Sequence, residues 1–100
     1  MARYTIILSP DPDAGAVTAI CPAMPGAITE GTTREEALHA MRGVMEVWIE
    51  MAAAKGYQPL VETPELVAAE IASVLGDRSL SGLDLTIETA RLEPAEAVLV

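Results

Sequence analysis

The sequence contains few residues of several types, and each scarcity excludes a kind of structure or partner. Its 100 residues include no Phe, one Cys, and six Lys and Arg against 15 Asp and Glu. One Cys cannot form an intrachain disulfide, and nothing in the sequence indicates an oxidising compartment. The formal net charge of −9 opposes direct contact with the phosphates of DNA or RNA. A basic protein is the electrostatic complement of such a chain.

Long apolar runs are also missing. The first apolar stretch, residues 4–8, is soon followed by Pro10, which leaves it too short for a signal peptide or a membrane span. We therefore expect a cytoplasmic protein with no membrane contact. The length fits one domain. A hydrophobic content of 51% is enough for a core of aliphatic residues and Met.

The first third of the sequence predicts a small antiparallel sheet. Residues 4–8 alternate in the manner of a strand, with Tyr4, Ile6 and Leu8 on one face. A tight turn rich in Pro, Asp and Gly leads to a second strand over residues 16–21, which is antiparallel because the connection is short. The prolines that follow cannot continue a central strand, so they predict a bend before a third strand over residues 27–30.

A long helix is predicted over residues 34–55. Thr33 and Glu36 match a capping box, in which the Thr33 hydroxyl accepts from the amide of Glu36 and the Glu36 carboxylate reaches back to the amide of Thr33. Gly56 suits a left-handed C-terminal cap. Trp48 and the methionines of this helix, Met41, Met45 and Met51, fit a core, with a ligand site or an interface as the alternative.

A second helix and a last strand are predicted after Gly56. Thr63 is the expected cap, Pro64 occupies the first helical position, and Gly76 is the expected end. Residues 83–89 alternate apolar with polar, which predicts a strand. The fold class is therefore α+β, with a β-β-β-α core over residues 1–56 and a C-terminal helix and strand, within residues 57–100, that extend the same domain.

Two motifs in the core together resemble the HicB family of antitoxins. Residues 22–26, PAMPG, are similar to the Pro-x-Leu-Pro-Gly turn of that family, and residues 31–37, GTTREEA, to its Gly-x-Thr-x-Glu-Glu-Ala helix start. The resemblance covers residues 3 to about 56. The motif residues with an expected structural role are Pro22, Pro25, Gly26, Gly31, Thr33 and Glu36.

The resemblance implies a truncated RNase H-like fold and a non-enzymatic protein that binds and neutralises a small basic mRNA interferase of the HicA type. The acidic residues expected to bind this partner are Glu30, Glu35, Glu46 and Glu50. Glu62, Glu65 and Glu70 could also engage a basic partner, or form a solvated face. A homo-oligomer, a dimer or a tetramer, is expected through sheet edges or the C-terminal strand.

The alternative function is a stand-alone oligomeric module, structural or ligand-binding, with no toxin partner. It predicts that Trp48 lines an apolar cavity instead of a filled core. DNA binding would need a helix-turn-helix with residues 65–75 as its first helix and residues 83–92 as its recognition helix. The second segment has the period of a strand and one cation, Arg91, so we expect no direct contact with nucleic acid.

The sequence holds no arrangement typical of a catalytic site. A two-metal nuclease would need clustered carboxylates, and no spacing makes Asp11, Asp13 and Glu30 converge. His39 lies toward the polar side of the long helix without a second His or a Cys nearby. Cys21 lies in a strand with no basic neighbour in sequence, as expected of a small buried hydrophobe. We therefore expect no catalytic residue, no metal and no cofactor.

Overall fold

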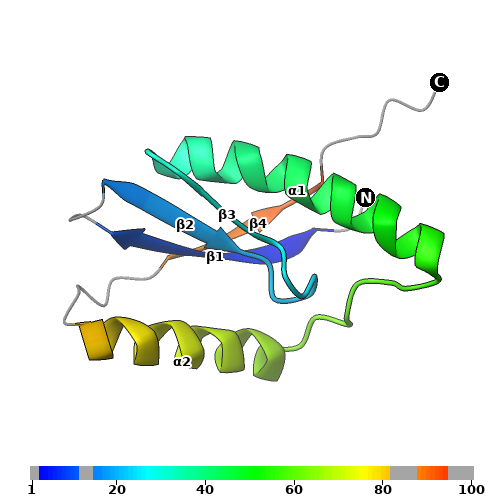
Figure 1. Cartoon of the computed structure of the whole chain (residues 1–100). Coiled ribbons are helices and arrows are strands. Elements are labelled where there is room, and N and C mark those ends of the chain that lie inside the picture. Colours follow the sequence, from blue (N-terminus) through cyan, green and yellow to red (C-terminus); the bar gives the residue numbers. More distant parts are fainter. Residues whose placement is uncertain (1–2, 12–14, 82–87, 95–100) are drawn as a thin grey trace.

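The computed structural model describes residues 3–11, 15–81 and 88–94, which form one four-stranded sheet and two helices (Figure 1). In chain order the elements are β1 Tyr4–Asp11, β2 Ala16–Ile20, β3 Ile28–Gly31, α1 Arg34–Lys55, α2 Pro64–Ser81 and β4 Glu88–Leu92. This confirms the α+β class and the antiparallel sheet.

The sheet has the strand order β3-β2-β1-β4, and every neighbouring pair is antiparallel. β1 is central, with β2 on one side and β4 on the other, where Tyr4 lies opposite Leu92. The last strand of the chain therefore completes the sheet beside the first. Of the strand expected at residues 83–89, residues 83–87 lie outside the described residues, and β4 continues to Leu92.

The bounds predicted for α1 are confirmed at both ends. The Thr33 hydroxyl accepts a hydrogen bond from the amide of Glu36 at 3.1 Å. The Glu36 carboxylate accepts from the hydroxyl of Thr32 at 2.7 Å, a donor that the capping-box prediction did not include. At the other end Gly56 adopts the left-handed conformation, with φ at 81°, and its amide donates to carbonyls of the last turn.

The main core lies between α1 and the sheet. Tyr4, Ile6 and Leu8 face α1, as their alternation predicts, and Met41 and Met45 of the helix are fully buried against the sheet. The other buried members of this core are Ala19, Cys21, Ala23, Met24, Ala27 and Ala37. Gly31 permits the close approach of the helix, because a Cβ there would lie 2.6 Å from the amide nitrogen of Ala37.

α2 lies on the opposite side of the sheet from α1 (Figure 1). Its cap is confirmed, since the Thr63 hydroxyl accepts from the amide of Leu66 at 3.1 Å. The predicted end at Gly76 is wrong, because the helix continues to Ser81 and Gly76 does not adopt a positive φ. A helix tolerates an internal Gly at a cost of only about 1 kcal/mol relative to Ala, so the residue alone does not stop it.

The course of α2 also excludes the helix-turn-helix that DNA binding would need. No turn follows Leu75, and residues 88–92 form β4 where a recognition helix would need to continue. In the part of the chain that the structure describes, neither helix combines the length and the apolar character needed to cross a bilayer.

Candidate functional site

Three of the four predicted partner-binding carboxylates lie along one outward line of α1. Glu35, Glu46 and Glu50 are separated by eleven and four residues, which keeps them on one side of an α-helix. His39 lies between them on the same line and is exposed, as expected. Because Ala37, Met41 and Met45 face the sheet, this line points into solvent. We call Glu35, Glu46 and Glu50 the acidic stripe.

The fourth predicted carboxylate, Glu30, lies apart from the acidic stripe. Its neighbour Gly31 packs against the start of α1. Successive residues of a strand point to opposite faces of the sheet, so Glu30 points to the side on which α2 lies. One flat partner surface cannot contact Glu30 and the acidic stripe at the same time. Partner binding by the acidic stripe and partner binding by Glu30 are therefore two separate predictions.

The acidic stripe is not neutralised within the described part of the chain. Its three carboxylates form no ion pair with another described side chain, whereas four arginines are engaged elsewhere. The ion pairs join Arg3 to Glu93, Arg34 to Glu88 and Arg91 to Glu62, and Arg42 donates to the carbonyl of Glu93. The negative charge of α1 is therefore available to a partner.

The motif residues of the bend have structural roles. Pro22 is buried, and Gly26 adopts a positive φ of 86°. The carbonyl of Pro25 accepts a hydrogen bond from the indole nitrogen of Trp48 at 3.0 Å, which fixes the bend against α1. The turn that the sequence singled out thus positions a side chain of the helix.

Cys21 is a buried structural thiol. Only 1% of the residue is exposed. Burial raises the pKa of the Cys21 thiol to about 11, although hydrogen bonds with the backbone of Met24 and Ala23 act in the opposite direction. A thiol held in its neutral form is a poor nucleophile, which agrees with the expectation of a small buried hydrophobe.

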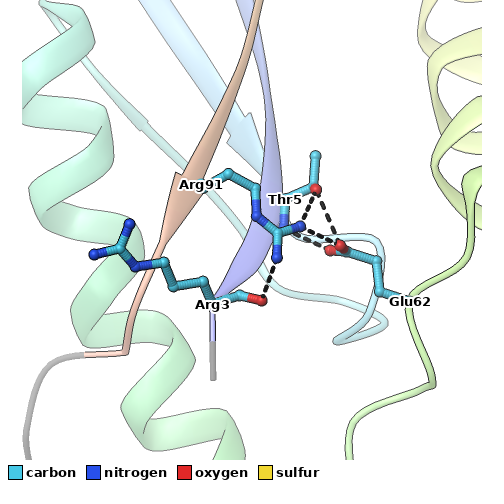
Figure 2. Close-up of polar contacts among 4 residues, drawn as sticks. All are labelled: Arg3, Thr5, Glu62 and Arg91. Atoms are coloured by element: carbon cyan, nitrogen blue, oxygen red, sulfur yellow. Dashed lines mark hydrogen bonds and ion pairs between the residues drawn. The ribbon is translucent and has the colours of Figure 1, made fainter. Parts of the chain in front are cut away.

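A polar cluster that the sequence did not reveal joins three distant segments (Figure 2). The Glu62 carboxylate, just before α2, accepts hydrogen bonds from the backbone amide and the hydroxyl of Thr5 in β1. It also forms an ion pair with Arg91 of β4, whose guanidinium donates to the Thr5 hydroxyl and to the carbonyl of Arg3. We call these four residues the Glu62 cluster.

The position of Thr5 beyond the end of β2 explains why Glu62 binds there. Pairing of β1 with β2 stops at Ile7 and Ile20, so the amide of Thr5 lies beyond the end of β2. The Glu62 side chain, 19% exposed, supplies an acceptor for that amide. Burial acts to raise the pKa of Glu62, but the hydrogen bonds from Thr5 and Arg91 outweigh it and lower this pKa below its ordinary value. Glu62 is thus engaged internally and does not serve as a free carboxylate for a partner.

The carboxylates of the nuclease alternative are only partly placed. Asp13 lies outside the described residues, and only the backbone of Asp11 is described. Glu30 is exposed on β3. Within the described ranges, no group of three His, Cys, Asp or Glu side chains is arranged to hold a metal ion.

The described residues line two open apolar hollows at the surface. One, of about 430 Å³, separates β1 from the first turns of α2 and is lined by Thr5, Glu62, Pro64, Val67 and Ile71 among others. The other, of about 320 Å³, lies at the C-terminal end of α1. Its lining residues are Pro25, Trp48, Met51, Ala52, Lys55, Tyr57, Gln58 and Leu60. We call this second hollow the Trp48 groove.

The acidic stripe and the Trp48 groove are the two surface features of α1 that could bind a partner or a ligand. Comparisons with protein-family models, with curated proteins and with solved structures find no match. The acidic stripe and the Trp48 groove lie on different sides of the second half of α1, because consecutive helical residues such as Glu50 and Met51 point about 100° apart.

Proposed function

We propose that this protein is a HicB-like antitoxin or an orphan relative, which binds and neutralises a small basic mRNA interferase of the HicA type without catalysing a reaction. The observation that carries the proposal is the acidic stripe, three carboxylates on one helix with no ion-pair partner among the described residues. An enzyme that holds RNA needs a basic surface, and such a surface is complementary to this stripe.

The arrangement of the core supports this proposal. β1, β2, β3 and α1 follow one another in the order that the resemblance to HicB-like proteins implies, with the helix packed on one face of the sheet. We interpret this unit as the truncated RNase H-like core, with α2 and β4 as additions to it. The bend at Pro22–Gly26 and the capped start of α1 at Thr33 lie within this unit.

We further propose that the protein self-associates through its sheet. Among the described strands, β3 and β4 form the two edges, and an open edge pairs readily with another strand. A dimer or a tetramer formed in this way leaves the acidic stripe free. Sedimentation equilibrium at micromolar concentration tests this: a 10.5 kDa species alone would contradict it.

The proposed setting is the cytoplasm, where an mRNA interferase would meet its substrate. One free, buried thiol is compatible with that reducing compartment. The proposed mode of action needs no cofactor and no contact between this protein and nucleic acid, since the partner is the RNA-binding component.

A stand-alone oligomeric module without a toxin partner is the second candidate. It is favoured by one observation, that Trp48 lines an open apolar groove. An unrelated protein encoded by the neighbouring gene would support it, whereas a small basic protein there would support the antitoxin.

Inhibition of RNA cleavage is the direct test of the antitoxin proposal. The purified chain is added to the small basic protein encoded beside it, and RNA cleavage is followed. We expect stoichiometric inhibition, and we expect the variant Glu46→Gln/Glu50→Gln to inhibit less well. The matched control is Glu65→Gln/Glu70→Gln, which removes the same charge from α2, on the opposite side of the sheet from the acidic stripe and so away from a partner bound there. Full cleavage in the presence of excess wild-type chain would reject the proposal.

A further inference from the structure

We propose that the Trp48 groove binds a small aromatic carboxylate, whose ring packs against Trp48 and Met51 and whose carboxylate pairs with the ammonium of Lys55. This inference goes beyond the proposed function. The groove and the acidic stripe lie on different sides of α1, so a ligand in the groove leaves the stripe free for a partner.

Aromatic and sulfur-containing side chains are gathered at the groove. The chain has one Trp, two Tyr and no Phe, and Trp48 and Tyr57 both line this hollow together with Met51. Met51 and Tyr57 are exposed, so a ligand can reach them. Aromatic rings pack favourably against Trp and Tyr rings and beside the sulfur of Met. The lining therefore favours an aromatic ring as the apolar part of the ligand.

Hydrogen bonds hold the walls of the groove in place. The Trp48 indole donates to the carbonyl of Pro25 at 3.0 Å, and the amide of Leu60 donates to the carbonyl of Ala23 at 2.7 Å. A preformed site loses little conformational entropy on binding. The volume of about 320 Å³ lies at the lower end of the range for ligand sites, so the ligand must be small.

Lys55 is the charged residue among the described residues that line the groove. It forms no ion pair with another described side chain, whereas four arginines are engaged. The end of a helix favours a cation, but carbonyls of the last turn of α1 already accept from the amides of Gly56 and Tyr57. The Lys55 ammonium therefore has hydrogen-bond donors available to an anion.

The carboxylates of α1 nearest in sequence to Trp48 point away from the groove. Glu46 and Glu50 are each two residues from Trp48, a rotation of about 200° around the helix axis, which places them on the opposite side of α1. None of the described lining residues is acidic. Repulsion from more distant carboxylates is screened over about 8 Å at physiological ionic strength. The groove therefore favours an anion although the chain has a formal net charge of −9.

The indole N–H of Trp48 provides the measurement, because the chain has one Trp and this Trp lines the groove. The probes are naphthoate and the matching naphthamide, which share a ring system and differ in charge. In proton–nitrogen correlation NMR spectra, naphthoate should shift the single indole signal with a Kd of about 1 mM, and naphthamide should bind about threefold more weakly. No saturable shift with naphthoate up to about 10 mM would overturn the inference.

Lys55→Gln tests the role of the cation. This variant should still bind naphthamide but should lose the preference for naphthoate. The matched control is Arg42→Gln, which removes the same charge from α1 at a residue that donates to the carbonyl of Glu93 and does not line the groove. It should keep the preference. Equal loss of the preference in both variants would assign it to net charge instead of Lys55 and would overturn the inference.

Met51→Ala and Val47→Ala locate the bound ring. The two residues lie one helical turn apart in α1 and are 55% and 53% exposed, but Val47 does not line the groove. Met51→Ala should lower the affinity for naphthoate by about threefold, and Val47→Ala should bind like the wild type. Equal effects would place the ligand elsewhere and overturn the inference. RNA cleavage tests the antitoxin proposal separately, so either proposal can fail while the other stands.

Discussion

The two faces of the sheet differ in how their helices are attached. On the α1 side, fully buried residues from β1, β2, the bend and the helix form one continuous core, including Ile6, Leu8, Met41 and Met45. On the α2 side, Ile7 is fully buried on β1, but Val67 and Ile71 of the helix are only half-buried beside an open hollow of about 430 Å³. The fold therefore depends on α1, and α2 is a cover added to it.

Polar contacts attach the start of α2 to the sheet, whereas apolar packing attaches α1. The start of α2 follows Glu62, whose carboxylate holds this part of the chain to Thr5 and Arg91. Elements with few buried apolar contacts open at lower free energy than the core. We therefore expect α2 to separate from the sheet before α1 does.

The largest effect is expected from truncating the core. Met45→Ala removes a fully buried side chain and should lower the free energy of unfolding by about 2 to 5 kcal/mol. Ile71→Ala removes a half-buried side chain beside a hollow and should cost about 1 kcal/mol. Urea denaturation measures both variants. Equal losses would show that the two faces contribute alike, which contradicts the comparison.

A tight backbone contact on the α1 side gives the next largest effect. Gly31→Ala would place a Cβ 2.6 Å from the amide nitrogen of Ala37 and 2.9 Å from the carbonyl carbon of Glu36. Because both neighbours are backbone atoms, the start of α1 must shift, at a cost of about 1 to 3 kcal/mol. Thermal unfolding measures this loss.

Gly43→Ala is the matched control, since it makes the same change within α1 where a Cβ meets no other atom within 4 Å. It should stabilise the protein, by about 1 kcal/mol or less, through the better helix propensity of Ala. If both variants lost stability equally, the close approach at Gly31 would not be the cause.

Local signals in the sequence predicted the α1 side well. The Thr33 cap, the Gly56 end and the apolar spacing of α1 all act within a few residues, so they gave its bounds as the structure has them. The acidic stripe also follows from helical spacing alone. Glu30 was grouped with the stripe because sequence order does not show which face of the sheet a short strand presents.

Contacts between distant residues account for what the sequence did not reveal. Arg91 and Glu62 are 29 residues apart, and their meeting depends on β4 pairing with β1, which no local pattern indicates. The Trp48 groove likewise needs the bend, α1 and the segment after Gly56 to come together. Gly76 was wrongly given as a helix end, because a glycine signals a stop only where the chain adopts a positive φ.

Removal of the Glu62 cluster should loosen α2 and leave α1 in place. Glu62→Gln loses the ion pair with Arg91, which is partly exposed, so we expect a cost of about 1 kcal/mol. Amide hydrogen exchange should show reduced protection within the described part of α2 and unchanged protection in α1. Glu65→Gln, in the first turn of α2 and outside the cluster, is the control. A uniform loss of protection would mean that the two helices unfold as one unit.

The attachment of α2 to the sheet should weaken at acidic pH. The pKa of Glu62 is lower in the folded protein than its ordinary value of 4.5. Its carboxylate therefore contributes stability that is fully present above that value and is lost as the pH falls through the folded pKa. Protection of α2 should decrease over this acidic range in the wild type. In Glu62→Gln this part of the pH dependence should be absent, and its persistence would assign it to other carboxylates.

The smallest effect is expected from strengthening α2 itself. Gly76→Ala fills a helical position where a Cβ meets no other atom within 4 Å, so it should stabilise the helix by about 1 kcal/mol or less. If α2 opens separately from the core, this gain should increase amide protection in α2 while the urea midpoint of the main transition stays nearly constant. The corresponding change in α1, Gly43→Ala, should instead move that midpoint. A shift of the main midpoint by both variants would join α2 to the cooperative core and remove the distinction between the two faces.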